Sequence, residues 1–172
     1  MKIYVANLKM YNMGRLVGKW IELPCDNLDE QLNLVLTNFG KLPDGYCEEV
    51  AIHDYEAPMS IGEYDDINEL NELAELIDST GYDEEVIEAL FEVTDTEYAK
   101  NKLENNEFYY VTNVFNYREL AEKMDEEMLP FDYSIIKGTS VESYIDWEMV
   151  GRDLDYSGTW YIAKNHVAIH VW

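Results

Sequence analysis

Three histidines are the first residues to consider for catalysis or metal binding. His53 stands beside Asp54, an order in which a carboxylate could orient an imidazole as a general base, but no nucleophile occupies a recognisable motif position. His166 and His170 are four residues apart, a spacing that brings two imidazoles to one metal ion only on a helix. The surrounding segment HVAIHVW is rich in strand formers, and in a strand this spacing is about 13 Å. We therefore expect His53 to be structural and no metal at His166 and His170.

Carboxylates are the other residues that could do chemistry, and they are concentrated in one segment. Residues 63–97, EYDDINELNELAELIDSTGYDEEVIEALFEVTDTE, contain fourteen Asp or Glu and no Lys or Arg. An EF-hand loop needs Gly at its sixth position, whereas DSTGYDEEVIEA has it at the fourth. There is no glycine-rich phosphate loop, and clustered carboxylates alone are a poor indicator of a glycosidase. The sequence predicts a protein that is not an enzyme and has no cofactor and no metal.

The acidity belongs mainly to the middle of the chain. The 172 residues carry 36 acids and 12 bases, a formal net charge of −24, of which −4 falls on 1–61, −14 on 62–107 and −6 on 108–172. Disorder is not expected, because 47% of the residues are hydrophobic and 13% are aromatic. A halophile-type surface would spread its acids evenly, and the uneven distribution argues against that interpretation.

Two predicted helices position most of these carboxylates. Apolar residues at steps of three and four predict a helix with one apolar stripe. Acids recur every three residues along the same helix. The stripe consists of Ile67, Leu70, Leu73, Ala74 and Ile77. Residues 79–81 end this helix, and 83–93 form a second one whose apolar side consists of Val86, Leu90 and Val93. Asp83, Glu84 and Glu85 fall in the first turn of the second helix, where the helix dipole favours acids.

The remaining acids on these helices need a separate explanation. Like charges at helical spacing destabilise a helix by roughly 0.2–0.5 kcal/mol per pair at low salt. Solvated helix faces usually mix charges of both signs, but no Lys or Arg occurs from residue 42 to residue 99. Two interpretations stay open beside the halophile one, namely a solvated acidic face and a surface shaped for a basic partner.

A basic partner that normally binds duplex DNA would suit such a surface. Fourteen carboxylates match the charge on roughly 24 Å of duplex. Carboxylates one helical turn apart lie about 5.4 Å from each other along the axis, comparable to the spacing of phosphates along a strand. The candidate partner-binding acids, which would stand in for phosphates, are Asp65, Asp66, Glu69, Glu72, Glu75, Asp78, Asp83, Glu84, Glu85, Glu88, Glu92, Asp95 and Glu97.

The first sixty residues predict a sheet with one helix on it. KIYVANLKMY and LVGKWIEL are β-rich runs around the turn formers Asn12 and Gly14, which predicts a hairpin that Pro24 ends. Residues 26–40 predict a helix that stops at Gly40. Its apolar positions are Leu28, Leu32, Val35, Leu36 and Phe39. EEVAIHDYE predicts a third strand.

The last third returns to mixed helix and strand, so the fold class is α+β. NEFYYVT predicts a strand, and NYRELAEKMDEEM and SVESYIDWEMVGRDL each predict a helix. GTWYIA and HVAIHVW predict two strands around the turn Lys164–Asn165. This tail is rich in aromatic and β-branched residues, as a sheet edge or a subunit contact would be.

Compartment and thiols follow from what the sequence lacks. There is no apolar run long enough for a signal peptide or a membrane span, and we expect a cytoplasmic protein. Cys25 and Cys47 match no metal spacing, and in that compartment they would be reduced, small, buried or partly buried residues.

Three stretches, in this order along the chain, carry a resemblance to a known family. They are IYVANLKMYNMGRLVGKWIELP, EEVAIHDYEAPMSIGEYDDINELNELAELI and YIDWEMVGRDLDYSGTWYIAKNHV. Together they span nearly the whole chain, and the sequence resembles the ArdA antirestriction proteins of conjugative plasmids and transposons. Trp147 stands where relatives more often have Tyr, which leaves an aromatic side chain in place.

The resemblance implies a non-catalytic DNA mimic without cofactors. It implies an elongated, curved chain of three small domains, a 1–61 N-terminal sheet with helix, a 62–106 acidic helical middle domain and a 107–172 C-terminal α+β domain that forms a homodimer. The implied targets are type I restriction-modification enzymes, bound in the DNA groove of the specificity and methyltransferase subunits. The implied antirestriction motif, near the dimer contact, consists of Tyr144, Ile145, Trp147, Gly151, Arg152, Asp153 and Leu154. Arg152 could instead form a local ion pair with Asp153 or Glu148.

Two alternative functions stay open beside DNA mimicry. The first is an acidic binding module for another basic DNA-binding protein, such as a nucleoid protein or a nuclease, without duplex-shaped geometry. The second is a low-affinity buffer of divalent cations. Competition with DNA for a restriction enzyme would separate the main function from the first alternative, and calorimetry with calcium would test the second.

Overall fold

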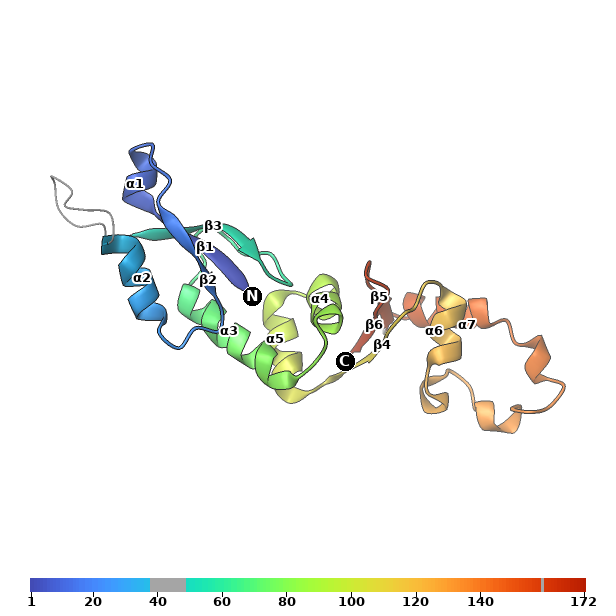
Figure 1. The fold of residues 1–172 in the computed structure, drawn as a ribbon. Helices are drawn as coiled ribbons and strands as arrows, with labels where there is room; N and C mark the ends of the chain where they lie inside the picture. Colours follow the sequence, from blue (N-terminus) through green and yellow to red (C-terminus); the bar gives the residue numbers. More distant parts are fainter. Residues whose placement is uncertain (38–48, 159) are drawn as a thin grey trace. The chain divides into compact units, whose positions relative to one another are not determined.

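The computed structural model describes residues 1–37, 49–158 and 160–172. Within these residues it has seven helices and two three-stranded antiparallel sheets, which confirms the predicted α+β class (Figure 1). The chain divides into two compact units, residues 1–81 and 82–172. The division into three domains stays a prediction. The expectations for Phe39, Gly40 and Cys47 concern residues outside those described.

The first unit is built on a sheet, as the sequence predicted, and its strand order is β2-β1-β3. Its strands are β1 (Lys2–Asn7), β2 (Gly18–Glu22) and β3 (Val50–Glu56). Helix α2 (Leu28–Thr37) contacts all three strands. Ile3 and Val5 of the central strand are fully buried, whereas Tyr4 between them lies on the other face, edge-on to the Trp20 ring. The sheet is thus apolar towards the helix and mixed on its outer face.

The predicted first strand is too long, because a short helix, α1 (Leu8–Asn12), replaces its second half. Asn7 explains the change. Its Oδ1 accepts from the backbone N of Met10 at 3.0 Å, which caps the helix, and its Nδ2 donates to the carbonyl of Val35 at 3.2 Å. Asn7 is fully buried, so one amide side chain joins β1, α1 and α2.

The first predicted acidic helix is confirmed as α3 (Ile67–Thr80). Asp66 caps its start, and Gly81 ends it in the left-handed conformation with φ +69°. Four of the five predicted apolar positions are buried and Ile77 is half-buried. The apolar stripe therefore faces the interior of the first unit, which leaves the acids on the solvent side.

The second unit is built on the sheet β4-β6-β5. Its strands are β4 (Phe108–Val111), β5 (Trp160–Ile162) and β6 (Ala168–Val171). The three predicted strands are confirmed and pair antiparallel, but the sheet-edge interpretation fails for β6, which pairs on both sides. Ala168 and Ile169, on opposite faces of β6, are both fully buried. Helices therefore cover both faces of this sheet.

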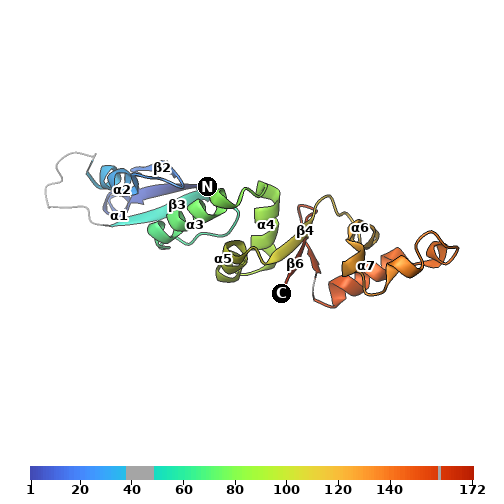
Figure 2. The same ribbon diagram turned by 90° about the horizontal axis from the view of Figure 1, so that it is seen from below.

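One face is covered by the acidic helix α4 (Glu84–Val93), and the other by α6 (Tyr117–Lys123) and α7 (Trp147–Tyr156) (Figures 1 and 2). The core on the α6–α7 side contains Val114, Leu120, Met124, Leu154, Trp160 and Ala168. A further helix, α5 (Thr96–Asn105), was not placed by the apolar pattern.

The two predicted C-terminal helices are shorter than expected. The first ends at Lys123 and is followed by a single 3-10 turn at Glu126–Met128. The second is interrupted after a 3-10 turn at Glu142–Tyr144, because Asp146 accepts a hydrogen bond from the backbone N of Met149 at 3.2 Å. That contact caps a new helix, so α7 begins at Trp147.

A buried lysine ties helix α5 to the last strand. Lys102 is 5% exposed, and its Nζ donates to Glu107 Oε2 at 3.1 Å and to the carbonyl oxygen of Trp172. The ammonium lies 5.0 Å from the centre of the Tyr98 ring. Residues 62–107 contain two bases, and one of them, Lys102, is thereby buried.

Candidate functional site

The predicted partner-binding acids of the first unit line the solvent side of α3 and the turn before it. All six are exposed, and they are Asp65, Asp66, Glu69, Glu72, Glu75 and Asp78. Asp65 closes the preceding turn by accepting from the backbone N of Gly62 at 2.7 Å. Glu75 accepts from the Nδ2 of Asn71 at 3.2 Å, a contact between neutral and acidic groups that leaves the negative charge in place.

Asp66 has two functions that its position explains. Its Oδ1 accepts from the backbone N of Asn68 at 2.8 Å, and this hydrogen bond lowers the pKa of the carboxyl. The same contact supplies one of the hydrogen bonds that the first turn of α3 lacks. Asp66 is therefore ionised and held at the start of the helix.

The acids of the second unit lie on α4 and at the start of α5. All seven are exposed, and they are Asp83, Glu84, Glu85, Glu88, Glu92, Asp95 and Glu97. Asp83 and Asp95 are the N-caps of the two helices, and the Asp95 side chain accepts from the backbone N of Tyr98 at 2.8 Å. The structure thus brings these acids together within each unit, as the sequence predicted for helices with one apolar face.

Cations are scarce around this acidic array, by which we mean the thirteen acids of the two preceding sets. Among the ion pairs of the described residues, a single one includes an array member, at 3.5 Å between Lys164 Nζ and Glu92 Oε1. Lys2, Arg118, Lys137 and Arg152 pair with acids outside the array. Twelve of the thirteen carboxylates thus face solvent without a cation from the described part of the chain.

Next to the array, the first unit has an acidic hollow that sequence reasoning missed. It has a volume of about 650 Å³ and lies between the start of α2 and α3. Glu72 and Glu75 line it from α3, and Asp26 and Glu30 line it from the other side. The half-buried thiol of Cys25 also lies here, and the Cys25 backbone N donates to Asn71 Oδ1 at 2.7 Å. The helices must be placed in space before these acids can be seen to share one surface.

The predicted antirestriction motif separates into buried and exposed residues. Gly151 and Leu154 are buried, and Leu154 belongs to the core between α6 and α7. A Cβ on Gly151 would lie 1.8 Å from the carbonyl oxygen of Tyr117, so only glycine permits this close approach of the two helices. These two residues have a structural role that the linear motif does not reveal.

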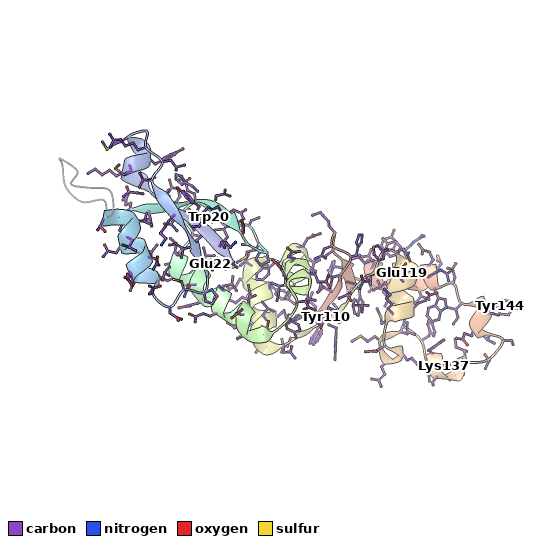
Figure 3. All side chains as sticks on the ribbon, viewed as in Figure 1. Trp20, Glu22, Tyr110, Glu119, Lys137 and Tyr144 are labelled. Carbon is purple, nitrogen blue, oxygen red and sulfur yellow. The ribbon has the colours of Figure 1, made fainter. Side chains whose placement is uncertain are left out.

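The other motif residues lie at or near the surface. Tyr144 is 86% exposed and projects from the segment before α7 (Figure 3). Ile145 and Trp147 are half-buried, the latter edge-on to Tyr133 with ring centres 5.5 Å apart. Asp153 is exposed. These exposed and half-buried residues are accessible for a contact with another chain.

Arg152 forms the local contacts expected of a lone base among acids. Its Nη2 lies 3.8 Å from Glu148 Oε1, one helical turn earlier, which confirms one of the two predicted ion-pair partners. The guanidinium lies 5.9 Å from the centre of the Tyr117 ring. Arg152 therefore links α7 to α6 as well as to its own helix.

Among the described residues, the three histidines contact aromatic rings, and His53 also lies near Glu63. His53 stacks edge-on against Tyr11 and lies 3.9 Å from Glu63, while Asp54 Oδ1 accepts from the backbone N of Tyr55 rather than from the imidazole. His166 lies in the turn before β6 and His170 within β6. The described residues contain no group of three or more His, Cys, Asp or Glu that could hold a metal ion.

Similarity to known proteins agrees with the acidic surface. A family model described as Antirestriction protein (ArdA) matches residues 3–168, and no curated protein sequence matches the chain. None of the helices in the described ranges has the length and apolar character of a membrane span. ArdA proteins are non-enzymatic inhibitors that act against restriction. Because the match covers nearly the whole chain, the chain belongs to the ArdA family of antirestriction proteins.

Proposed function

We propose that this protein is a DNA mimic that occupies the DNA-binding groove of a type I restriction-modification enzyme and so blocks restriction. The enzyme's specificity and methyltransferase subunits form the groove in this proposal, and the twelve array carboxylates without a cationic partner among the described residues take the places of phosphates. Because the methyltransferase uses the same groove, blocking of modification would follow from the same contact. The protein acts by occupancy and needs no cofactor.

The observation that carries the proposal is the near absence of cations around the array. Twelve exposed carboxylates on α3, on α4, at the start of α5 and in the turn before α3 have no cationic partner among the described residues. Repulsion between acids at helical spacing works against folding by roughly 0.2–0.5 kcal/mol per pair. A surface selected only for solubility would relieve that repulsion with interleaved lysines. A cationic groove would relieve it on binding instead.

The C-terminal residues support a second part of the proposal, a homodimer. The acidic array opposes self-association by like-charge repulsion, whereas Tyr144, Ile145 and Trp147 offer apolar surface at a distance in sequence from it. We place the dimer contact at this exposed part of the antirestriction motif. Sedimentation at micromolar concentration is expected to show a dimer that Tyr144→Ala weakens, and a monomer across that range for the parent would contradict the assignment.

The test of the mimicry is a competition titration of the protein against a labelled duplex on a purified type I methyltransferase. The parent protein should displace the duplex, with an affinity that falls steeply with salt because ions are released from both surfaces. Single changes such as Glu72→Gln should weaken binding by at most about 1 kcal/mol, since each carboxylate would contribute one solvent-exposed ion pair with a cation of the partner. The sevenfold variant neutralises Glu69, Glu72, Glu75, Asp78, Glu84, Glu85 and Glu88 and should compete far more weakly.

Thermal melts separate loss of charge from loss of fold. The sevenfold variant should melt at or above the temperature of the parent, because it relieves like-charge repulsion. Glu127→Gln serves as a control, since this exposed acid lies outside the array. If the sevenfold variant folds and competes as well as the parent, the array is only a solvated face. If the parent never displaces DNA from the methyltransferase, the groove is not its target.

A further inference from the structure

The turn between β5 and β6 lies against the acidic helix α4. The backbone N of Lys164 donates to Glu92 Oε1 at 3.2 Å, and the Lys164 ammonium lies 3.5 Å from the same oxygen. Asn165 Nδ2 donates to the backbone carbonyl of Glu85 at 2.8 Å and lies 3.5 Å from Glu88 Oε2. Two consecutive side chains of the turn thus hold two turns of the helix.

The turn itself is held in place by its own contacts. The backbone N of Ala163 donates to Val167 O at 2.9 Å, and the His166 carbonyl accepts from the backbone N of Val114 at 2.7 Å. His166 has a positive φ of 66°, and its ring packs on Phe115 with centres 4.3 Å apart. These contacts fix the position of the turn on the sheet, so the turn can hold a helix in place.

The contacts distinguish individual acids of α4. Glu85 and Glu92 are seven residues apart, nearly two helical turns, so they lie on one stripe with Glu88 beside it. Around the helix Glu84 lies about 100° from Glu85, about 80° from Glu92 and about 40° from Glu88, and its side chain has no hydrogen bond or ion pair from the described residues. The Glu92 side chain is 34% exposed and pairs with Lys164, whose side chain is 88% exposed, whereas the exposed Glu84 carboxylate has no cationic partner among the described residues.

We propose that the Lys164–Asn165 turn is a positioning element for α4, which engages Glu92 in a contact with the turn and leaves Glu84 as a carboxylate that meets the cationic partner. This assignment rests on the proposed DNA mimicry and says which acids of α4 take part in it. Lys164 itself would repel a cationic groove, so the partner approaches α4 from the side of Glu84. Glu92 is thereby a structural acid within the array.

Glu84→Gln and Glu92→Gln form a matched pair, because both make the same change on the same helix. In the competition titration on the methyltransferase, Glu84→Gln should weaken binding about two- to fivefold and lower the slope of log affinity against log salt by up to about one. Glu92→Gln should leave both the affinity and the salt slope unchanged. An equal loss of slope in the two variants would overturn the assignment.

Asn165→Ala tests positioning separately from charge. It removes no charge, but it releases the helix from the turn, so binding should weaken about two- to fivefold with an unchanged salt slope. Circular dichroism shows whether the variant stays folded. A folded Asn165→Ala variant that competes as well as the parent would refute a positioning role.

Thermal melts test the internal contact without any partner. Glu92→Gln and Lys164→Met should each lower the Tm by about 1–3 °C, and the double variant should melt no lower than either single one. Additive shifts would overturn the contact. These melts of the two single variants and the double variant also distinguish the two proposals. A parent that fails to displace DNA refutes mimicry and with it the role of Glu84. The melts still test the contact between Glu92 and Lys164 in that case.

Discussion

Replacing Gly151 by Ala tests whether the antirestriction motif acts through packing. The added Cβ would lie 1.8 Å from the carbonyl oxygen of Tyr117 and 2.5 Å from its carbonyl carbon, both backbone atoms that cannot rotate away. Ordinary contact begins at 3.4 Å, so α7 must move about 1.6 Å from α6. That movement separates Leu154 from the side chains of α6 in the shared core.

The expected cost of Gly151→Ala follows from two opposing effects. Overpacking against backbone costs about 3 kcal/mol, at the upper end of the usual range for added methyl groups. Alanine favours the helix by about 1 kcal/mol relative to glycine. The net loss of about 2 kcal/mol lowers the Tm of a unit of this size by roughly 10 °C.

Thermal unfolding followed by circular dichroism measures this loss, with Asp153→Ala as the control. Asp153 is exposed on the same helix, so its replacement should change the free energy of unfolding by no more than about 0.5 kcal/mol. A Gly151→Ala variant that melts at or above the parent would refute the packing argument. So would a variant of normal stability that loses antirestriction, since Gly151 would then act at a contact surface.

Three further changes test contacts described above. Asn7→Ala removes a helix cap and a buried hydrogen bond and should lower the free energy of unfolding of the first unit by about 2–4 kcal/mol, measured with urea. Lys102→Met leaves the Trp172 carbonyl and the half-exposed Glu107 without their partner and should destabilise the second unit by about 1–3 kcal/mol, which tryptophan fluorescence in urea would detect. Burial lowers the pKa of His170 from 6.5, so the imidazole is protonated at a higher pH in the unfolded chain than in the folded one, and the free energy of unfolding should fall as the pH drops below about 6.5. His170→Phe should make the free energy of unfolding depend less on pH. A urea midpoint of the parent that does not change with pH in this range would contradict the prediction.

The sequence predicts the helices and strands best where the apolar period is strong. The stripe from Ile67 to Ile77 places α3 correctly, because four of its five positions are buried. Helix α5 has the sequence TEYAKNKLEN, in which Ala99, Leu103 and the stem of Lys102 are the buried residues, too few apolar positions for a periodic signal. Lys102 counts as polar in any such pattern, although it is an internal residue here.

Errors in the predicted boundaries have a common cause. Asn7 and Asp146 begin new helices with their side chains, inside segments whose hydrophobicity suggested one continuous element. Whether such a residue caps a helix or only faces solvent depends on neighbours distant in sequence, such as Val35 for Asn7. The same holds for the candidate site, where the sequence identifies the acids, but only the placement of the β5–β6 turn separates Glu92 from Glu84.

The aspartates at the helix starts allow the net charge of this protein to be changed without a change in its fold. Asp66 and Asp95 cap helices through a side-chain oxygen that asparagine also has, and asparagine caps about as well. Glutamine has nearly the helix propensity of glutamate, so the remaining acids allow the same kind of isosteric exchange. A series of variants that differ by single charges on one unchanged backbone can therefore be made. Such a series would measure how the affinity of a DNA-binding groove depends on the number of negative charges, one charge at a time.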